Sequence, residues 1–404
     1  MNNLLNDFLK YVSYDTISDP TSGLHPSTDH QFALAKVLLT QLKELGCTDC
    51  FLSDKCYCYA TILENCSGYP TIGLMAHMDT APDMSGKDVK PRIIYNYDGS
   101  DIILNEELNI VMRSDEFPFL KNRIGETLVV TDGTTLLGAD DKAGIAIIMD
   151  IIRTLNNNPD LKHGKIKICF TPDEEIGEGA DNVDLERFAC DFAFTYDGDL
   201  ENVINCENFN AASAFVTIHG ANIHPGSAKG KMKNSIMIAN EFDSLLSPIA
   251  RPQFTENYEG FNHLNEISGC VEETKMKYII RNHDLTKFEN QKKDFLKAKS
   301  VIEEKYGPNT CSIEINDSYF NMYNIVSKHP EIIERAKKAI LDAGMQPALA
   351  PIRGGTDGAR LTYEGIITPN LGTGGANYHG KFEYVSLEGM ARAVKVGINL
   401  LTTK

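Results

Sequence analysis

Residues 71–76 of this 404-residue chain read TIGLMA, a run of apolar residues after the first position, which predicts a buried strand. Strand-like runs at 165–170 and 192–196 follow, and they alternate with segments of helical periodicity at 31–46 and 142–155. Strand, helix and strand in this order are typical of α/β layering. We therefore expect an α/β domain with a mostly parallel central sheet flanked by helices.

The pattern changes at about Ala211, where alternating strand-like runs are separated by an amphipathic segment and a charged helical segment. This order predicts a smaller α+β insert of the ferredoxin-like type with one solvated sheet face. We expect a split domain of residues 1–208 and 320–404, interrupted by this insert at 209–319. Residues 81–135 predict turns and short antiparallel strands that elaborate the split domain, and their role is not evident from the sequence.

The formal net charge is −17 at pH 7, and the acidic residues are spread along the chain. Such a charge repels nucleic acid and anionic membranes. No apolar run approaches the roughly 18 residues that span a bilayer, and the first residues lack the pattern of a signal peptide. We expect a cytoplasmic protein with no nucleic-acid or membrane partner.

Four of the ten cysteines form a local cluster: Cys47, Cys50, Cys56 and Cys58. One hypothesis is a structural zinc site, and the other is a set of reduced thiols. Cys56 and Cys58 would point to the same face of a strand, and no second cysteine pair follows at zinc-finger spacing. This favours reduced thiols, as in other cytoplasmic proteins.

Polar residues stand where the predicted strands end or where a helix begins. They are His77 and Asp79, Asp140 and Asp141, Asp173 with Glu174 and Glu175, Asp197, and His379 in a glycine-rich loop. In an open α/β sheet, ligand sites form at this rim, outside the carboxyl ends of the strands. Imidazoles and carboxylates without a thiol favour Zn²⁺, with Mn²⁺ or Co²⁺ as substitutes. The excess of carboxylates favours two metals that share one carboxylate, a pair able to activate a water and polarise a carbonyl.

Each signal alone has an ordinary explanation, since a single histidine at a strand end is usually a surface residue and acidic doublets are common in turns and helix caps. Five such groups at successive element ends favour a joint site. His77 and Asp79 share a strand face, so Asp79 can orient the imidazole ring. In the Glu174-Glu175 doublet, one carboxylate can bind metal while the other acts as general base.

Several motifs together resemble the M20 peptidases, a family of dinuclear-zinc enzymes, and within it the tripeptide aminopeptidases. They include AHMDT, LLGADDKAG, FTPDEEIGEGA, HPGSAKGKMKNS, PIRGGTDGA and NYHGKFEYVSLEGM. The resemblance runs almost from end to end. It implies that the split domain is catalytic and that the insert is a lid or dimerisation-type domain.

The resemblance also implies two Zn²⁺ ions per subunit with one shared ligand, Asp140. The implied ligand sets are His77, Asp140 and Asp197 for one ion, and Asp140, Glu175 and His379 for the other. Asp79 would be the supporting catalytic carboxylate and Glu174 the general base.

Three residues are candidates for substrate binding. The resemblance implies that His224 of the insert stabilises the oxyanion, although a plain loop histidine is the alternative. Arg281 and Arg353 are candidates for the C-terminal carboxylate of a peptide, because a guanidinium matches a carboxylate in a two-pronged pair. Surface ion pairing is the alternative for both. The sequence leaves open whether His224 acts within its own chain or across a homodimer.

These observations lead to three hypotheses about function. The first is a metallo-aminopeptidase that removes the N-terminal residue of tripeptides. The second is an N-acyl-amino-acid deacylase or desuccinylase that uses the same metal site. The third is a metal-binding or regulatory protein without catalysis, which would have no need for the additional acid Glu174.

Overall fold

The computed structural model describes residues 2–404, and the chain divides into two compact units. Unit 1 consists of Met1–Cys206, Asn324–Ala350 and Thr356–Lys404, and unit 2 consists of Glu207–Tyr323 and Pro351–Gly355. The short segment Pro351–Gly355 therefore belongs with unit 2, although it lies far along the chain from the rest of that unit. Within residues 2–404, no helix has the length and apolar character needed to cross a membrane.

Unit 1 is built on an eight-stranded sheet with the order β1-β2-β8-β3-β9-β16-β10-β15. The four central strands run parallel: β8 (Ile166–Thr171), β3 (Ile72–His77), β9 (Phe192–Gly198) and β16 (Asn370–Gly372). The outer strands are β1 (Thr48–Leu52), β2 (Cys58–Ile62), β10 (Val203–Asn205) and β15 (Ala348–Leu349). Antiparallel pairing begins at β2 on one side and at β10 on the other. The predicted mostly parallel central sheet is confirmed.

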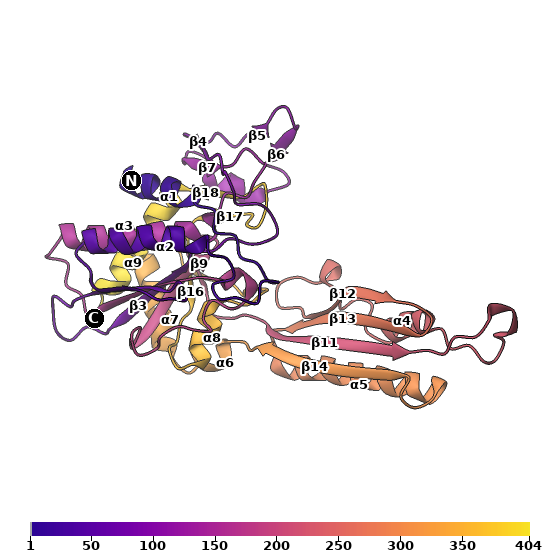
Figure 1. Cartoon of the computed structure of the whole chain (residues 1–404). Helices are drawn as coiled ribbons and strands as arrows, with labels where there is room; N and C mark the ends of the chain where they lie inside the picture. The colour runs from indigo at the N-terminus through magenta and orange to yellow at the C-terminus, as the bar shows by residue number, and fades with distance from the viewer. Residues whose placement is uncertain (1) are drawn as a thin grey trace. The chain divides into compact units, whose positions relative to one another are not determined.

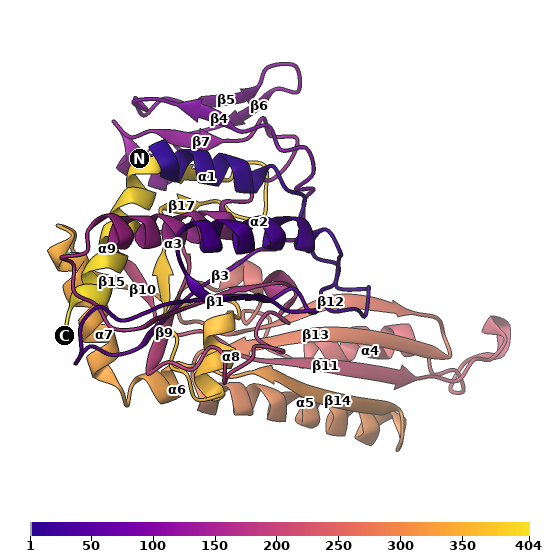
Figure 2. The ribbon, with the colours of Figure 1, turned by 60° about the vertical axis from the view of Figure 1, so that its left-hand side comes forward.

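Helices cover both faces of this sheet, with α2 and α3 on one side and α8 on the other (Figures 1 and 2). Neighbouring residues of β9 mark the two faces: Tyr196 reaches the carbonyl of Ala393 in α9, whereas Thr195 lies against Gly358 in α8. The helices of unit 1 are α1 (Asn2–Val12), α2 (Gln31–Glu44), α3 (Ala139–Asn157), α7 (Pro330–Asp342), α8 (Asp357–Tyr363) and α9 (Leu387–Thr402), and α6 (Tyr323–Val326) starts at the division between the units.

The region of residues 81–135 contributes to a second, smaller sheet of unit 1. Its order is β17-β18-β7-β4, with β4 (Arg92–Ile94), β7 (Leu128–Val130), β17 (Gly375–Ala376) and β18 (Tyr384–Ser386). A hairpin of β5 (Ile102–Asn105) and β6 (Ile110–Met112) and the short 3₁₀ helix η1 (Pro118–Arg123) complete the region. A separate core that includes Tyr97, Leu104 and Leu128 also takes in Tyr384 of β18. Because β17 and β18 flank residue 379, this elaboration supports the loop that carries His379.

Unit 2 contains a four-stranded antiparallel sheet with the order β12-β13-β11-β14. The strands are β11 (Asn210–His219), β12 (Phe261–Gly269), β13 (Glu273–Asn282) and β14 (Cys311–Tyr319), and the helices are α4 (Ser235–Ser244) and α5 (Leu285–Tyr306), with 3₁₀ turns η3 (Pro225–Ser227) and η4 (Pro252–Phe254). The chain order β-α-β-β-α-β with this strand order is ferredoxin-like, as expected. Strand β12 was absent from the sequence prediction, because its second half is exposed and lacks alternation.

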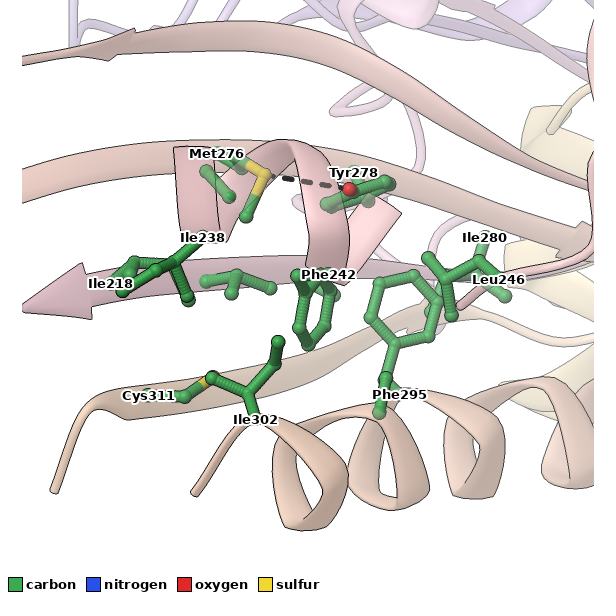
Figure 3. Packing of buried hydrophobic residues seen from close by; sticks show 14 of the residues in the cluster. Ile218, Ile238, Phe242, Leu246, Met276, Tyr278, Ile280, Phe295, Ile302 and Cys311 are labelled. Atoms are coloured by element: carbon green, nitrogen blue, oxygen red, sulfur yellow. Dashed lines mark hydrogen bonds between the residues drawn. The ribbon is translucent and has the colours of Figure 1, made fainter. Parts of the chain in front are cut away.

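The core of unit 2 lies between one sheet face and its two helices, as Figure 3 shows. Phe242 of α4 and Phe295 of α5 meet over the strands, and Tyr278 of β13 packs edge-on against Phe295 at a centroid distance of 5.0 Å. Each such buried side chain contributes about 1.5–3 kcal/mol through removal of apolar surface from water. Asp284 begins α5 as its N-cap and accepts the N–H of Lys287.

Candidate metal centre and active site

Three side chains of unit 1 form a first group of metal-ligand type. His77 is the last residue of β3, Asp197 lies near the end of β9, and Asp140 stands at the beginning of α3. His77 Nε2 lies 2.9 Å from Asp140 Oδ1 and 3.6 Å from Asp197 Oδ1. One donor atom from each residue falls within 4.8 Å of the other two. The parallel strands therefore deliver these side chains to one point of the sheet rim.

A second group shares Asp140 with the first. Glu175 follows β8 in the short 3₁₀ helix η2 (Glu174–Ile176), and His379 lies in the loop between β17 and β18. His379 Nε2 is 2.9 Å from Glu175 Oε2 and 3.3 Å from Asp140 Oδ2. The two oxygens of Asp140 thus face different imidazoles, which is the arrangement that a bridging carboxylate requires.

The electrostatics of the cluster show its attraction for positive charge. Burial works to lower the pKa of His77, but its hydrogen bonds to Asp140, Asp197 and Asp79 outweigh burial and raise the pKa well above the usual value. Hydrogen bonds to Asp140 and Glu175 raise the pKa of His379 to about 11. Burial works to raise the pKa of Asp140, but the two imidazoles lower it overall. A site with this excess of carboxylates stabilises cations.

The donor set fits metal ions. Glu175 Oε1 is buried and has no hydrogen-bond partner within residues 2–404, so this oxygen is available as a ligand atom. Such an orphaned acceptor is costly to bury without a partner. Imidazole nitrogens and carboxylate oxygens, with no thiol in either group, suit Zn²⁺ and its close substitutes.

Asp79 has two sets of contacts. Its Oδ1 lies 3.3 Å from His77 Nδ1, and its backbone carbonyl lies 3.1 Å from the same nitrogen. In addition, the fully buried carboxylate accepts the backbone N–H groups of Glu174 and Glu175, at 3.0 and 3.1 Å. The sequence predicted only the contact with His77, since hydrogen bonds to the backbone of a distant segment leave no pattern in the sequence.

Glu174 occupies the first position of η2 beside the cluster and is partly buried. Burial and the negative charge of Asp197 raise the pKa of Glu174 well above its usual value. A carboxylate with a raised pKa accepts a proton more readily, as a general base near neutral pH must.

Several residues that the sequence analysis did not single out support the ligands. Thr356 Oγ1 and Asn370 Nδ2 lie 3.3 and 3.4 Å from Asp197 Oδ2, as donors. Glu383 is buried and accepts the backbone N–H of Asp140 at 3.0 Å, together with the N–H groups of Leu137 and Gly138. The only sequence feature that could have indicated a role for Glu383 is its position directly before strand β18.

The three substrate-binding candidates all lie in unit 2. His224 is exposed, and its Nδ1 accepts the N–H of Gly226. Arg281 donates through Nη1 to the carbonyls of Ala212 and Ile280 and lies 5.4 Å from the ring centroid of Tyr319.

Arg353 is bound to other backbone of unit 2. Its Nη1 donates to the carbonyls of Asn257 and Glu259, and its Nη2 donates to the carbonyl and hydroxyl oxygens of Thr255. Its guanidinium also stacks over the rings of Phe209 and Phe261. These contacts hold the segment around residues 255–259 to Arg353.

His224 and Arg281 lie toward opposite ends of the unit 2 sheet. Arg281 pairs with Ala211 near the beginning of β11, whereas His224 follows the last residue of that strand, His219. Ala211 and His219 are 8 positions apart (219 − 211), which at about 3.3 Å per residue corresponds to roughly 26 Å. The structure does not bring His224 and Arg281 together within one chain.

Comparison with known proteins identifies the class to which this fold and site belong. Residues 130–403 match the model of peptidase family M20/M25/M40; the chain belongs to this family and is a peptide hydrolase. Over 402 residues the chain is 53% identical to Peptidase T of Clostridium novyi, with 99% of both chains covered. It is 51% identical over 402 residues to Peptidase T of Caldanaerobacter subterraneus, covering 99% of this chain and 98% of the relative.

Solved structures share the fold. The aminopeptidase PepT from Bacillus cereus matches with a TM-score of 0.77 at 23% identity, covering 99% of this chain and 98% of that chain. A tripeptidase from Staphylococcus aureus matches with a TM-score of 0.76 at 21% identity, covering 99% and 97%. A dinuclear metal binding peptidase of the M20 family from Bacillus subtilis gives a TM-score of 0.66 at 15% identity, covering 99% and 97%.

Proposed function

We propose that this chain is a metal-dependent aminopeptidase that releases the N-terminal residue of tripeptides. The observation that carries the proposal is the pair of ligand groups joined through Asp140, in a chain similar from end to end to proteins named Peptidase T. The alternative, an N-acyl-amino-acid deacylase, is not favoured, because these full-length relatives are peptidases.

The proposed ligands are those of the two groups: His77, Asp140 and Asp197 for one ion, and Asp140, Glu175 and His379 for the other. We propose Zn²⁺ for both, with Mn²⁺ or Co²⁺ as substitutes. When bound, two such ions would lower the pKa of a water and polarise the scissile carbonyl.

Glu174 is the proposed general base. It would take a proton from the attacking water and return it to the amine that leaves when the peptide bond breaks. Asp79 supports this chemistry from two directions, because it contacts the ring of His77 and holds the backbone N–H of Glu174. The ring orientation and the base position therefore depend on one buried carboxylate.

We propose that Arg281 binds the C-terminal carboxylate of the peptide. Within residues 2–404, Arg281 donates hydrogen bonds through Nη1 alone. The N–H groups of Nη2 and Nε are therefore available to donate to a substrate carboxylate. Arg353 was the second candidate, but both of its Nη atoms donate to unit 2 oxygens. We propose that it acts indirectly, by ordering the segment around residues 255–259.

We propose that His224 reaches the substrate from a second copy of the chain in a homodimer. An extended tripeptide spans at most about 10 Å, far less than the roughly 26 Å of strand between the ends of the sheet that carry Arg281 and His224. If both residues contact one tripeptide, they belong to different subunits. Co-expression of His224→Ala and Arg281→Ala chains with different tags tests this arrangement: the mixed dimer should regain activity at one of its two sites, and recovery would be absent if both residues acted within one chain.

A cytoplasmic role in peptide catabolism is proposed as well. Within residues 2–404 no cysteine forms a disulfide, and this holds for Cys47, Cys50, Cys56 and Cys58 of the local cluster. Cysteines without disulfides are typical of proteins kept in a reducing compartment.

A substrate panel tests the proposed function. The tripeptide Met-Gly-Gly, the dipeptide Met-Gly and N-acetylated Met-Gly-Gly would each be incubated with the zinc-loaded protein, and free methionine and acetate would be measured. We expect fast release of methionine from the free tripeptide, and little reaction with the dipeptide and the blocked peptide. Release of acetate from the blocked peptide that is faster than release of methionine from the free tripeptide would overturn the aminopeptidase assignment in favour of the deacylase.

A further inference from the structure

The segment between α1 and α2 lies beside the proposed active site, although no motif of the sequence assigned it a role. Residue 17 forms a parallel bridge with Thr80, the residue that follows Asp79. The N–H of Thr80 donates to the carbonyl of Thr16, and the N–H of Ser18 donates to the carbonyl of Thr80, each at 3.1 Å. One end of the segment is therefore attached to the strand end that carries His77 and Asp79.

The other end of the segment is attached to Asp173, the residue directly before Glu174. Ser27 donates its backbone N–H to Asp173 Oδ2 at 2.7 Å and its hydroxyl to Asp173 Oδ1 at 2.5 Å. Gln31 Nε2 donates to Asp173 Oδ1 at 2.7 Å, and the backbone N–H of Asp173 donates to Gln31 Oε1 at 3.3 Å. His25 Nδ1 lies 3.4 Å from Asp173 Oδ2. A fully buried carboxylate thus receives at least three hydrogen bonds from a single segment.

These contacts require a carboxylate at position 173. Three donors point at this side chain: the backbone N–H and the hydroxyl of Ser27, and the side-chain amide of Gln31. An ionised carboxylate can accept all three, because it has acceptor oxygens and no donor. An asparagine would offer one oxygen and turn its NH₂ group toward a donor. Asp173 also has a left-handed backbone conformation, with φ 57°, which is unfavourable for a residue with a side chain and needs support from its surroundings.

The residues that follow Asp173 are held on a second side. Asp79 accepts the backbone N–H groups of Glu174 and Glu175, so the turn is fixed between the Asp79 carboxylate and the Ser27–Gln31 contacts of Asp173. The N–H of Glu178 donates to the carbonyl of Asp173 and closes the turn. The backbone of Glu174 is therefore held on one side by the contacts of Asp173 and on the other by the Asp79 carboxylate, which restricts where the Glu174 side chain can point.

We propose that Asp173, Ser27 and Gln31 are positioning residues for the hydrolysis, which fix the backbone of Glu174 so that its carboxylate meets the attacking water. This inference rests on the proposed role of Glu174 as general base. A displacement of about 1 Å in a catalytic group costs on the order of 100-fold in rate. The contacts of Asp173 therefore matter for turnover more than for substrate binding.

The test compares Ser27→Ala, Asp173→Asn and a control in the full-length, zinc-loaded protein with Met-Gly-Gly as substrate. Ser27→Ala should lower kcat about 10-fold and Asp173→Asn about 100-fold, with KM and metal content unchanged. Ser235→Ala is the matched control, because it also removes a buried serine hydroxyl with two hydrogen-bond partners, but in unit 2. Its kcat should equal that of the unmodified protein.

The decisive step repeats Ser27→Ala in a Glu174→Ala background. If Ser27 acts through Glu174, its substitution should change the residual turnover of the Glu174→Ala protein by less than about twofold. An equal loss in both backgrounds, an unchanged kcat, or a loss of kcat in proportion to lost metal would each overturn the positioning role. If Asp173→Asn does not fold, the milder Ser27→Ala carries the test. Full activity of Glu174→Ala would instead refute the role of Glu174 as general base, whereas failure of the unmodified protein to release methionine from Met-Gly-Gly would refute the proposed function.

Discussion

Asp79 accepts the backbone N–H of Glu174, at 3.0 Å from Oδ1, although the two residues are 95 positions apart in the chain. The same carboxylate lies 3.3 Å from the imidazole of His77. A candidate metal ligand and the proposed general base are therefore linked through one buried side chain. Asp79 therefore contacts the backbone of Glu174 in addition to the imidazole ring of His77.

Substitution of Asp79 by asparagine should damage both functions. The amide keeps one acceptor oxygen, so one of the N–H groups of Glu174 and Glu175 would lose its partner. We expect a loss of about 1–3 kcal/mol in the free energy of unfolding, because a buried donor is left unpaired, and a fall in kcat. Urea unfolding and steady-state kinetics measure the two effects. An unchanged unfolding free energy would show that the backbone contacts contribute nothing.

Substitution of Glu174 by glutamine should separate metal binding from proton transfer. The side chain keeps its size, and Glu174 is in neither group of ligand atoms. We expect unchanged zinc content and a loss of about 10²–10⁴-fold in kcat, the usual contribution of a general base. Elemental analysis beside the kinetic assay checks this. Loss of zinc from the variant would contradict the role assigned to Glu174.

Metal binding should release protons. Without metal, the carboxylates raise the pKa of His379 to about 11 and that of His77 above its usual value, so both imidazoles bind a proton more tightly than a free histidine does. A ligand histidine must be neutral, so protons compete with the metal and the apparent zinc affinity should fall as the pH falls. Calorimetric titrations in two buffers of different ionisation enthalpy measure the proton release. Equal heats in both buffers would contradict it.

The ion pair of Arg123 and Glu201 should stabilise unit 1 near neutral pH, and this stabilisation should be lost in acid. The two residues are almost fully buried and form two hydrogen bonds of 2.9 Å. Burial works to raise the pKa of Glu201, but Arg123 and then Arg392 lower it to about 2 from 4.5. Because the folded pKa lies below the unfolded value, the stabilisation is present above about pH 4.5 and is lost as the pH falls toward 2. It amounts to about 3 kcal/mol.

Unfolding free energies at pH 6 and pH 2.5 test this contribution. The unmodified protein should lose more stability between these pH values than Glu201→Gln, in which position 201 does not titrate. The variant should also be less stable at pH 6, because Arg123 remains buried without its charged partner. Equal acid sensitivity of the two proteins would contradict the assignment.

The sequence predicted that the candidate metal ligands lie close together, because of a simple property of parallel sheets. The carboxyl ends of β3, β8 and β9 meet at one edge, so polar residues after apolar runs, such as His77 and Asp197, come together there. Strand β12 was not predicted, because its exposed half lacks the alternation of apolar and polar residues that indicates a strand. The contacts of Asp79 with backbone N–H groups and those of Asp173 with Ser27 depend on three-dimensional proximity, which hydrophobic periodicity does not report. For the same reason, no sequence pattern indicated that the guanidinium of Arg353 donates to backbone carbonyl oxygens.

In the proposed mechanism, two metal ions held by residues that share Asp140 support peptide hydrolysis. Its most direct test is a titration of the metal-free protein with Zn²⁺, in which Met-Gly-Gly hydrolysis and bound zinc are followed together. We predict negligible hydrolysis without metal and a rise of the hydrolysis rate to a plateau at two bound zinc ions per chain. Asp140→Asn should reach neither the full rate nor two bound zinc ions. Full hydrolysis in excess chelator, or a plateau of activity with the unmodified protein at a single zinc ion, would contradict the account.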